Sequence, residues 1–343
     1  MKAVVIAAPN RAALCDEPDP RPGRGQILVR VGAAGICMSD VETLKGTRPA
    51  PYVKYPVIPG HEWSGTVERL GPGATGVAVG DRVAVEGHNF CRACEWCRRG
   101  ETNLCASYNE LGFTLPGGFA EYVAVRADLA HPFAKALPFE SAAVAEPLAC
   151  VVHGAQRATI AAGDTVVVVG PGTLGLLAVG WAAVAGPARI VVIGVDRGNE
   201  ALARRMGATD FLTVADDPVA RVREMTAGAG AGVVFEAAGS EGALPLALDL
   251  ARRGGTVILY GIAGGGRRTQ LEADLFCLKD LHVHGVFAYT TASFEQALRL
   301  IESGRLDVAP LVTHTFPLAD FQKAFDLLRR RAEPVVKVIL KPQ

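Results

Sequence analysis

The sequence predicts an α/β protein in which a β-rich domain is joined to a doubly wound parallel sheet. Two observations carry this prediction. Short apolar segments separated by Gly/Pro turns fill about the first 150 residues, and strand-like and helical segments then alternate through the middle of the chain. With 343 residues, half of them hydrophobic, the chain is long and apolar enough for two packed domains.

In the first part, short apolar segments are flanked by turn sequences such as Pro20–Gly23 and Gly71–Gly73. Glycine and proline supply the backbone angles that tight turns need, so these sequences end one strand before the next begins. The predicted strands are Lys2–Ile6, Gln26–Val31, Arg82–Glu86 and Glu121–Arg126.

The middle of the chain begins with Val166–Val169, a continuous apolar run typical of a strand buried on both faces. A helical segment follows as far as Val184, and strands and helices then alternate, which predicts a parallel sheet. The further predicted strands are Arg189–Ile193, Phe211–Val214, Val233–Ala237, Thr256–Tyr260 and Leu281–Val286. Two amphipathic helices, Ser293–Ser303 and Leu318–Arg329, and a closing strand, Val335–Leu340, complete the chain.

The formal net charge is zero and the isoelectric point is near 7, so the composition lacks the basic excess of proteins that bind nucleic acid or anionic membranes. No apolar run reaches the length of a membrane span, and the N-terminal segment does not have the pattern of a signal peptide. We therefore expect a soluble, cytoplasmic protein with no nucleic-acid or membrane partner. In that compartment the eight cysteines indicate metal binding or catalysis, because disulfides are rare there.

Four of the cysteines lie within fifteen residues, in the pattern C-x2-C-x2-C-x7-C. Four thiolates this close in sequence can surround one tetrahedral Zn²⁺, and a complete four-sulfur shell leaves no position for a substrate. The pattern therefore predicts a structural zinc site. Unrelated buried or disulfide-bonded cysteines are the alternative, which the tight spacing disfavours. The predicted ligands are Cys91, Cys94, Cys97 and Cys105.

The strand at Val166–Val169 runs into a glycine-rich turn that opens the following helix. In a dinucleotide site of this kind the first glycine makes the tight turn, the second lets the backbone approach the pyrophosphate, and the third lets the helix pack on the strand. Free N–H groups at the helix N-terminus then bind the phosphates. A glycine-rich turn without a ligand is the alternative, but the strand–turn–helix context favours a dinucleotide site. The candidate residues are Gly170, Gly172, Thr173, Leu174 and Gly175.

An acidic residue that binds the adenosine ribose is expected at the end of the second strand, about 20 residues after the glycines. Gly194 occupies that place, and Asp196 and Arg197 follow it. The missing carboxylate removes repulsion against a 2′-phosphate, and Arg197 could pair with one, which favours NADP over NAD. Asp196 could instead turn back to the ribose and favour NAD, so the choice of nucleotide stays open.

Residues suited to a second metal site precede the nucleotide motif. Cys37 lies in a turn of small residues, His61 is followed by Glu62, and Glu146 lies just before the predicted nucleotide domain. One thiolate, one imidazole and one carboxylate would form a zinc shell with a free position for water or a substrate oxygen. Taken singly, these residues have simpler explanations: a small buried side chain, a loop histidine and an acid at a helix start. Their occurrence beside a cysteine cluster and a nucleotide motif favours the metal site.

Motifs in both halves of the chain match those of one enzyme family. Gly60-His61-Glu62-x-x-Gly65-x5-Gly71 and Gly80–Val83 match a zinc signature, and Cys91–Cys105 matches a structural zinc loop. On these motifs the chain resembles the zinc-dependent medium-chain dehydrogenases/reductases of the alcohol dehydrogenase superfamily, over essentially its whole length. Glu146–Leu148 resembles the branch of polyol, sorbitol and threonine dehydrogenases, and Pro56–Val67 together with Glu110–Thr114 is locally similar to aminocyclitol dehydrogenases.

The resemblance implies a GroES-like β catalytic domain over residues 1–152, completed by residues 290–343, and a Rossmann NAD(P)-binding domain over residues 153–289. It also implies two zinc ions per subunit, one catalytic and one structural, and a homodimer or homotetramer. The implied activity is hydride transfer between a secondary alcohol and NAD(P)+, with zinc acting as a Lewis acid. The small-molecule substrate would be a polyol, a cyclitol or a hydroxy-amino compound.

The same resemblance assigns roles near the catalytic zinc. Cys37 and His61 would bind it, with either Glu62 or Glu146 as the third ligand. Three further residues, which follow Cys37 in the sequence, would take part in proton transfer or in positioning the ligands. Ser39 would take the alcohol proton, Asp40 would orient His61, and Glu42 stands where the family often has the histidine that ends the proton relay.

Two other functions stay open at this point. The first is reduction of a C=C or C=N bond on the same fold, which should be accompanied by loss of zinc ligands or of Ser39, and neither is lost. The second is a non-enzymatic nucleotide-binding sensor, which the intact set of predicted ligands disfavours. The leading hypothesis is therefore the alcohol oxidoreductase.

Overall fold

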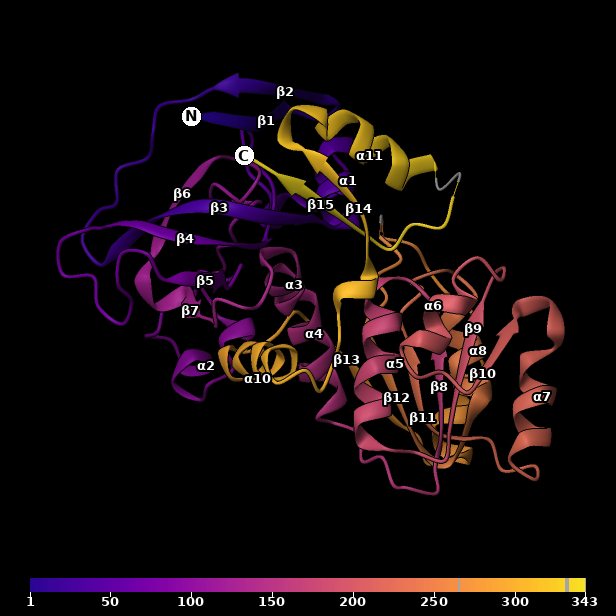
Figure 1. The fold of residues 1–343 in the computed structure, drawn as a ribbon. Coiled ribbons are helices and arrows are strands. Elements are labelled where there is room, and N and C mark those ends of the chain that lie inside the picture. Colours follow the sequence, from indigo (N-terminus) through magenta and orange to yellow (C-terminus); the bar gives the residue numbers. More distant parts are fainter. Residues whose placement is uncertain (265, 331–332, 343) are drawn as a thin grey trace. The chain divides into compact units, whose positions relative to one another are not determined.

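The computed structural model describes residues 1–264, 266–330 and 333–342. The chain divides into two compact units (Figure 1). Unit 1 contains Met1–Ala149, Thr290–Gly304 and Val312–Gln343, and unit 2 contains Cys150–Tyr289 and Arg305–Leu311. Among the described residues, no helix is long and apolar enough to cross a membrane.

Within the described residues, unit 1 holds a seven-stranded sheet and a separate hairpin. The strands of the sheet follow the order β14 (Val312–Pro317), β15 (Lys337–Lys341), β3 (Gln26–Ile36), β4 (Glu62–Leu70), β5 (Arg82–Val85) and β7 (Ala130–Pro132), and β6 (Tyr122–Arg126) pairs with β3. β14 and β15 are parallel, and the other neighbours are antiparallel. The hairpin joins β1 (Lys2–Ala8) to β2 (Arg11–Asp16).

The paired strands β3 and β4 form the centre of this sheet and lead into the candidate site. Their apolar side chains, among them Val31, Trp63 and Val67, are buried in the core of unit 1. Burial of a large apolar side chain contributes about 1.5–3 kcal/mol, so this pairing is firmly held. Directly after β3 the chain enters α1 (Met38–Lys45), which ends at Gly46 in the left-handed conformation with φ 74°.

Helices cover the sheet of unit 1. α11 (Phe321–Arg330) lies beside β14 and β15 (Figure 1) and buries Phe321, Phe325 and Leu328, which are spaced as one face of a helix. The other α-helices of the unit are α2 (Glu95–Arg98), α3 (Phe139–Ala143) and α10 (Thr291–Glu302), and α4 (Ala145–Ala155) runs from unit 1 into unit 2.

Unit 2 holds a parallel sheet, which has six strands in the described part of the chain. The strands follow the order β10 (Asp210–Thr213), β9 (Arg189–Gly194), β8 (Thr165–Val169), β11 (Ala231–Glu236), β12 (Ala251–Leu259) and β13 (His282–Gly285). The order reverses between β8 and β11, and ligands of such sheets bind at the carboxyl ends of the strands beside that point. The helices, seen in Figure 1, are α5 (Thr173–Ala185), α6 (Glu200–Arg205), α7 (Pro218–Met225), α8 (Ala243–Leu250) and α9 (Asp274–Leu278).

The predicted fold class is confirmed, and each predicted strand overlaps an observed one. The strands that the sequence pattern does not predict are β2, β4, β7 and β14. They are very short or mix polar and apolar side chains. Their local sequence pattern therefore does not predict a strand, and pairing with neighbouring strands determines their structure.

Candidate active site

Cys37, His61 and Glu62 come together in unit 1. Their sulfur, imidazole nitrogen and carboxylate oxygen all lie within 4.8 Å of one another. Glu62 opens β4 opposite Gly35 of β3, and Cys37 follows Gly35 by two residues, immediately before α1. The register between β3 and β4 therefore brings these distant residues together.

The buried carboxylate of Asp40 holds the two backbone segments that carry Cys37 and His61. Its Oδ2 accepts a hydrogen bond from the N–H of Cys37 at 2.8 Å, and its Oδ1 accepts one from the N–H of Gly60 at 3.2 Å. Oδ1 also lies 3.6 Å from Nδ1 of His61. Burial lowers the pKa of His61, but Asp40 and Cys37 outweigh burial and raise that pKa well above its usual value. Asp40 thus lies where it can position both Cys37 and His61.

Glu146 lies in the first turn of α4 and is buried. Among the described residues it lies outside the 4.8 Å group, although its carboxyl group interacts electrostatically with His61 and Glu62. Burial raises the pKa of Glu146 to about 7, and nearby Glu62 adds to this effect while His61 opposes it. All four residues expected at the catalytic zinc thus lie in one region of unit 1, with Glu62 inside the group and Glu146 beside it.

A residue that the sequence reasoning missed, Lys337 of β15, completes this region. Its Nζ lies 2.5 Å from Oε2 of Glu62 and donates to the carbonyl oxygen of Ile36 at 3.3 Å. The signal in the sequence is a lone lysine within the apolar segment Val335–Leu340. A charged residue in a buried strand almost always has a partner, and here that partner is a predicted zinc ligand.

The group fits a zinc ion. A sulfur, an imidazole nitrogen and a carboxylate oxygen are the three donor types that Zn²⁺ accepts in sites with an open position. The charge also fits, because the buried cation Lys337 interacts with the carboxylates of Glu62 and Glu146 and with the thiol of Cys37. A bound divalent cation would offset the remaining negative charge.

Ser39 and Glu42 both lie on α1, three residues apart, where side chains share a helix face. Both residues are half-buried. The carbonyl oxygen of Ser39 accepts a hydrogen bond from Oγ1 of Thr43 at 2.9 Å, and that of Glu42 accepts one from the N–H of Thr47 at 3.0 Å. The two residues predicted for the proton relay therefore start from the same short helix.

The four clustered cysteines form the second group of potential metal ligands. Their sulfur atoms lie within 4.8 Å of one another, and those of Cys91 and Cys97 are 3.9 Å apart. Sulfurs placed about 2.3 Å from a tetrahedral zinc ion lie about 3.8 Å apart, so the observed spacing fits the metal. Cys94 and Cys97 are placed by α2, and Cys105 follows a 3-10 turn, Thr102–Leu104.

Backbone N–H groups point at these sulfurs. Sγ of Cys91 accepts hydrogen bonds from the N–H groups of Ala93 at 3.4 Å and Cys94 at 3.3 Å, and Sγ of Cys105 accepts one from the N–H of Cys91 at 3.2 Å. Similar donors, first among them the N–H of Ala106, lower the pKa of Cys94 to about 6. Such bonds stabilise the thiolate, which is the form that binds zinc.

The glycine turn between β8 and α5 has the geometry that a dinucleotide needs. Gly170 has a backbone φ of 96°, which residues other than glycine rarely adopt. A Cβ at Gly172 would meet no atom within 4 Å, so the helix N-terminus stays open, whereas a Cβ at Gly175 would lie 1.9 Å from the carbonyl oxygen of Gly170. Thr173 and Leu174 form the first turn of α5. The turn fits a pyrophosphate at the helix N-terminus.

Gly194 ends β9, at the place where an acid was expected. A Cβ there would lie 2.7 Å from the carbonyl oxygen of Asp196 and 3.0 Å from Cζ of Phe211, which explains why no larger residue occupies this position. The Asp196 side chain is engaged locally, since its Oδ1 accepts a hydrogen bond from the N–H of Gly198 at 2.8 Å.

The exposed guanidinium of Arg197 is held by two acids. It donates to Oε2 of Glu200 at 2.7 Å and to Oδ2 of Asp216 at 3.5 Å. The side chain is 54% exposed, so a phosphate could reach it, but a phosphate would compete with both carboxylates.

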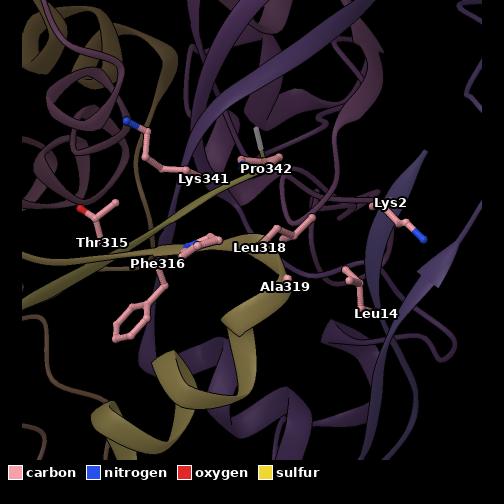
Figure 2. A pocket seen from close by; sticks show the side chains of 9 residues that line it. Lys2, Leu14, Thr315, Phe316, Leu318, Ala319, Lys341 and Pro342 are labelled. Carbon is pink, nitrogen blue, oxygen red and sulfur yellow. The ribbon is translucent and has the colours of Figure 1, made fainter.

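A surface cavity of about 380 Å³ lies elsewhere in unit 1 (Figure 2). It lies among β1, β2, β14 and β15 and contains no residue predicted for the site. Its lining residues are Lys2, Leu14, Thr315, Phe316, Pro317, Leu318, Ala319, Lys341 and Pro342. The cavity is therefore separate from both groups of candidate metal ligands.

Comparison with known proteins identifies the family. Residues 23–135 match the alcohol dehydrogenase GroES-like domain, and residues 173–303 match the zinc-binding dehydrogenase domain. The chain is 35% identical to the erythritol/L-threitol dehydrogenase of Mycolicibacterium smegmatis, over all of this chain and 98% of that protein. It is 34% identical to the sorbitol dehydrogenase of Halalkalibacterium halodurans, over all of this chain and 99% of that protein.

A solved structure shows the same fold. A zinc-binding dehydrogenase from Sinorhizobium meliloti 1021, crystallised with NADP, has a TM-score of 0.92 and 30% sequence identity, with 99% of each chain covered. The chain belongs to the zinc-dependent medium-chain dehydrogenases of the alcohol dehydrogenase superfamily. The predicted family, fold class and enzyme class are thereby confirmed: this protein is an oxidoreductase.

Proposed function

We propose that this chain oxidises a secondary alcohol that carries several hydroxyl groups, with NAD(P)+ as the hydride acceptor. The observation that carries the proposal is the group of three different zinc donors, Cys37, His61 and Glu62, within 4.8 Å. The names of the two relatives, which act on erythritol, L-threitol and sorbitol, support a polyol as the substrate.

When bound, the zinc ion would supply Lewis-acid polarisation of the alcohol oxygen, and the nicotinamide would supply the hydride acceptor. The chain's own residues place these groups. Cys37 and His61 serve as ligands on segments that Asp40 fixes through two backbone hydrogen bonds. Glu62 stands inside the group and Glu146 beside it, so either carboxylate can serve as the third ligand.

The proton of the alcohol has to leave the site. We propose that the hydroxyl of Ser39 accepts it and that Glu42, on the same side of α1, passes it on. Since a carboxyl group replaces the imidazole that related enzymes often have at this place, the pH profile of the reaction would depend on Glu42.

For the nucleotide we propose NADP. The turn Gly170–Gly175 would bind the pyrophosphate through the first N–H groups of α5. Gly194 carries no carboxylate to repel a 2′-phosphate, and Arg197 is exposed beside it. The Sinorhizobium meliloti relative was solved with NADP and an E. coli CFT073 relative with NADH, so the choice of NADP rests on Gly194 and Arg197 alone.

We also propose that the cysteine cluster holds a second, structural zinc ion. Residues 1–152 with 290–343 would act as the catalytic domain, and residues 153–289 as the nucleotide domain. By analogy with the family, the subunits would associate as a homodimer or homotetramer.

Formation of reduced nicotinamide by the zinc-loaded protein tests the proposal, with erythritol, threitol, sorbitol and threonine as alcohols and NAD+ or NADP+ as acceptor. Oxidation should disappear in Cys37→Ser and persist in Cys277→Ser, which changes an exposed cysteine outside both clusters. Absence of oxidation, and of reduction of the matching ketones, in protein with full zinc content would contradict the proposal and favour the nucleotide-binding sensor.

A further inference from the structure

A second cluster of polar side chains, the Arg48–Glu110 cluster, lies in unit 1 and consists of Arg48, His88, Tyr108 and Glu110. The buried carboxylate of Glu110 joins its members. Oε2 accepts a hydrogen bond from Nη2 of Arg48 at 3.1 Å and another from the hydroxyl of Tyr108. Oε1 lies 3.5 Å from Nε2 of His88. Loops after α1 and β5 and before β6 contribute these residues, so the tertiary fold assembles the cluster.

Phe113 connects this cluster to the metal site. Its side chain is 1% exposed, and its ring centroid lies 4.7 Å from that of His61. The Cζ atom of Arg48 lies 3.6 Å from the same ring centroid. One buried ring therefore touches both a predicted zinc ligand and the arginine. Glu110 and His88 also interact electrostatically with Glu146, which places the cluster beside the reacting region.

Arg48 is held in a fixed orientation by two hydrogen bonds, and further N–H groups of its guanidinium stay available to a ligand. Its Nε donates to the carbonyl oxygen of Tyr52 at 2.9 Å, and its Nη2 donates to Glu110. A guanidinium has five N–H groups, and within the described part of the chain these two bonds engage only two of them. The side chain is 15% exposed, so a ligand can approach it. A positioned guanidinium of this kind orients a polar substrate at little entropic cost.

The charge around Arg48 indicates what kind of group it binds. Glu110 balances its positive charge, and two more carboxylates, Glu86 and Glu146, act on neighbouring His88. A phosphate monoester carries about −1.5 to −2 charges near neutral pH, and here it would face buried carboxylates without an excess of positive charge. A hydroxyl group needs no such excess.

Resting on the proposed function, we propose that Arg48 is a specificity residue that donates hydrogen bonds to a substrate hydroxyl beyond the reacting carbon. The site would then select neutral polyols over both their phosphate esters and simple aliphatic alcohols. Arg48 plays no part in binding zinc, so its contribution should depend on whether the substrate carries that second hydroxyl.

The test compares kcat/KM for the best neutral polyol among erythritol, threitol and sorbitol, for the phosphate ester of that polyol, and for 2-butanol. Arg48→Met should lower kcat/KM for the polyol about 10- to 100-fold, mainly through KM, and change it less than about 3-fold for 2-butanol. Arg48→Lys should show the same pattern as Arg48→Met, a loss for the polyol with little change for 2-butanol, because lysine lacks the planar fork of the guanidinium. Arg30→Met, which removes an arginine paired with exposed Glu68, serves as the control and should leave all three values unchanged.

Glu110→Gln tests the charge argument with almost the same shape. It should raise kcat/KM for the phosphate ester relative to the polyol by about 10-fold, since it leaves the charge of Arg48 unbalanced. Equal losses for polyol and 2-butanol in both Arg48 variants would show a purely structural role and overturn the proposal. So would a wild-type preference for the phosphate ester. A wild-type protein that oxidises no alcohol, 2-butanol included, would instead overturn the proposed function together with this inference.

Discussion

The Nζ of Lys337 and the Oε2 of Glu62 lie 2.5 Å apart, and both side chains are 2% exposed. Lys337 donates its second hydrogen bond to the carbonyl oxygen of Ile36, at the end of β3 just before Cys37. The ion pair thus ties the closing strand of the chain to both segments that carry predicted zinc ligands. Removing one partner of a buried ion pair leaves the other charge without compensation, which typically costs about 3–5 kcal/mol.

Lys337→Met should therefore destabilise the protein by about 3–5 kcal/mol and weaken zinc binding at the Cys37 group, because the charge and position of Glu62 are no longer held. Chemical denaturation and metal analysis after dialysis against a chelator measure the two effects. Lys341→Met is the matched control on the same strand, since its partner Glu140 and Lys341 itself are partly exposed. Its effect should stay below about 1 kcal/mol. Equal effects of the two substitutions would show that burial of Lys337 has no special role.

Asp40→Asn should lower zinc affinity at the catalytic group about 10- to 100-fold, as losses of residues behind metal ligands usually do. The physical reason is that an amide NH₂ would replace one of the two oxygens that accept the N–H groups of Cys37 and Gly60. Competition with a chromogenic chelator measures the affinity. Asp81→Asn alters a similar acceptor in an exposed turn, where Oδ2 takes the N–H of Ala78 at 2.7 Å, and should leave zinc affinity unchanged.

Cys94→Ser should remove one zinc ion per chain and leave the other in place. The sulfurs of the cysteine cluster already have the spacing of a tetrahedral site. Loss of one of the four ligands should therefore prevent this site from holding its zinc ion. Metal analysis gives the zinc content, and thermal unfolding should show a lower midpoint. Cys277→Ser, at an exposed cysteine, is the control. Unchanged zinc content in Cys94→Ser would contradict a metal site at this cluster.

Arg197→Ala should raise KM for NADP+ about 10-fold and leave KM for NAD+ nearly unchanged, since only NADP+ carries the 2′-phosphate that the guanidinium would bind. Arg204→Ala is the matched control, because Arg204 pairs with the same acid, Glu200, at 2.9 Å. A wild-type enzyme that prefers NAD+ would mean that Glu200 and Asp216 keep Arg197 from the nucleotide.

His153 predicts a pH dependence of stability in unit 2. Burial, followed by the charge of Arg157, lowers the pKa of His153 to about 4 from its ordinary value of 6.5. The Nη2 of Arg157 lies 3.1 Å from Nε2 of the ring, an arrangement that requires an unprotonated nitrogen there. Because the folded-state pKa is depressed, the neutral ring contributes stability that is complete above pH 6.5 and is lost as the pH falls toward 4.

His153→Asn should therefore reduce the loss of stability between about pH 7 and pH 5, by at most about 2 kcal/mol. Unfolding midpoints at the two pH values give the difference. The same substitution at His282, which is exposed on β13, should leave the pH dependence as in the wild type. Identical pH dependence in His153→Asn and wild type would contradict a neutral buried histidine.

The sequence by itself determined the features that depend on neighbouring residues. Four cysteines within fifteen residues can reach one ion whatever the rest of the chain does. Gly170, Gly172 and Gly175 shape a turn whose geometry is set by a few consecutive backbone angles. The apolar runs of the parallel strands likewise carry their own signal, because such strands are buried on both faces.

Only the tertiary structure decided which distant residues share the catalytic region. Cys37 meets His61 and Glu62 because β3 and β4 pair in one register, and a slip by one residue would turn the side chains to opposite faces. Lys337 reaches Glu62 across 275 positions of sequence, and Arg48 reaches Glu110 across 62. No local pattern encodes such pairs, since each side chain's partner and burial depend on how whole strands and loops pack. The zinc and nucleotide motifs could therefore be predicted residue by residue, whereas the ion pair behind Glu62 and the cluster around Arg48 emerged only from the fold.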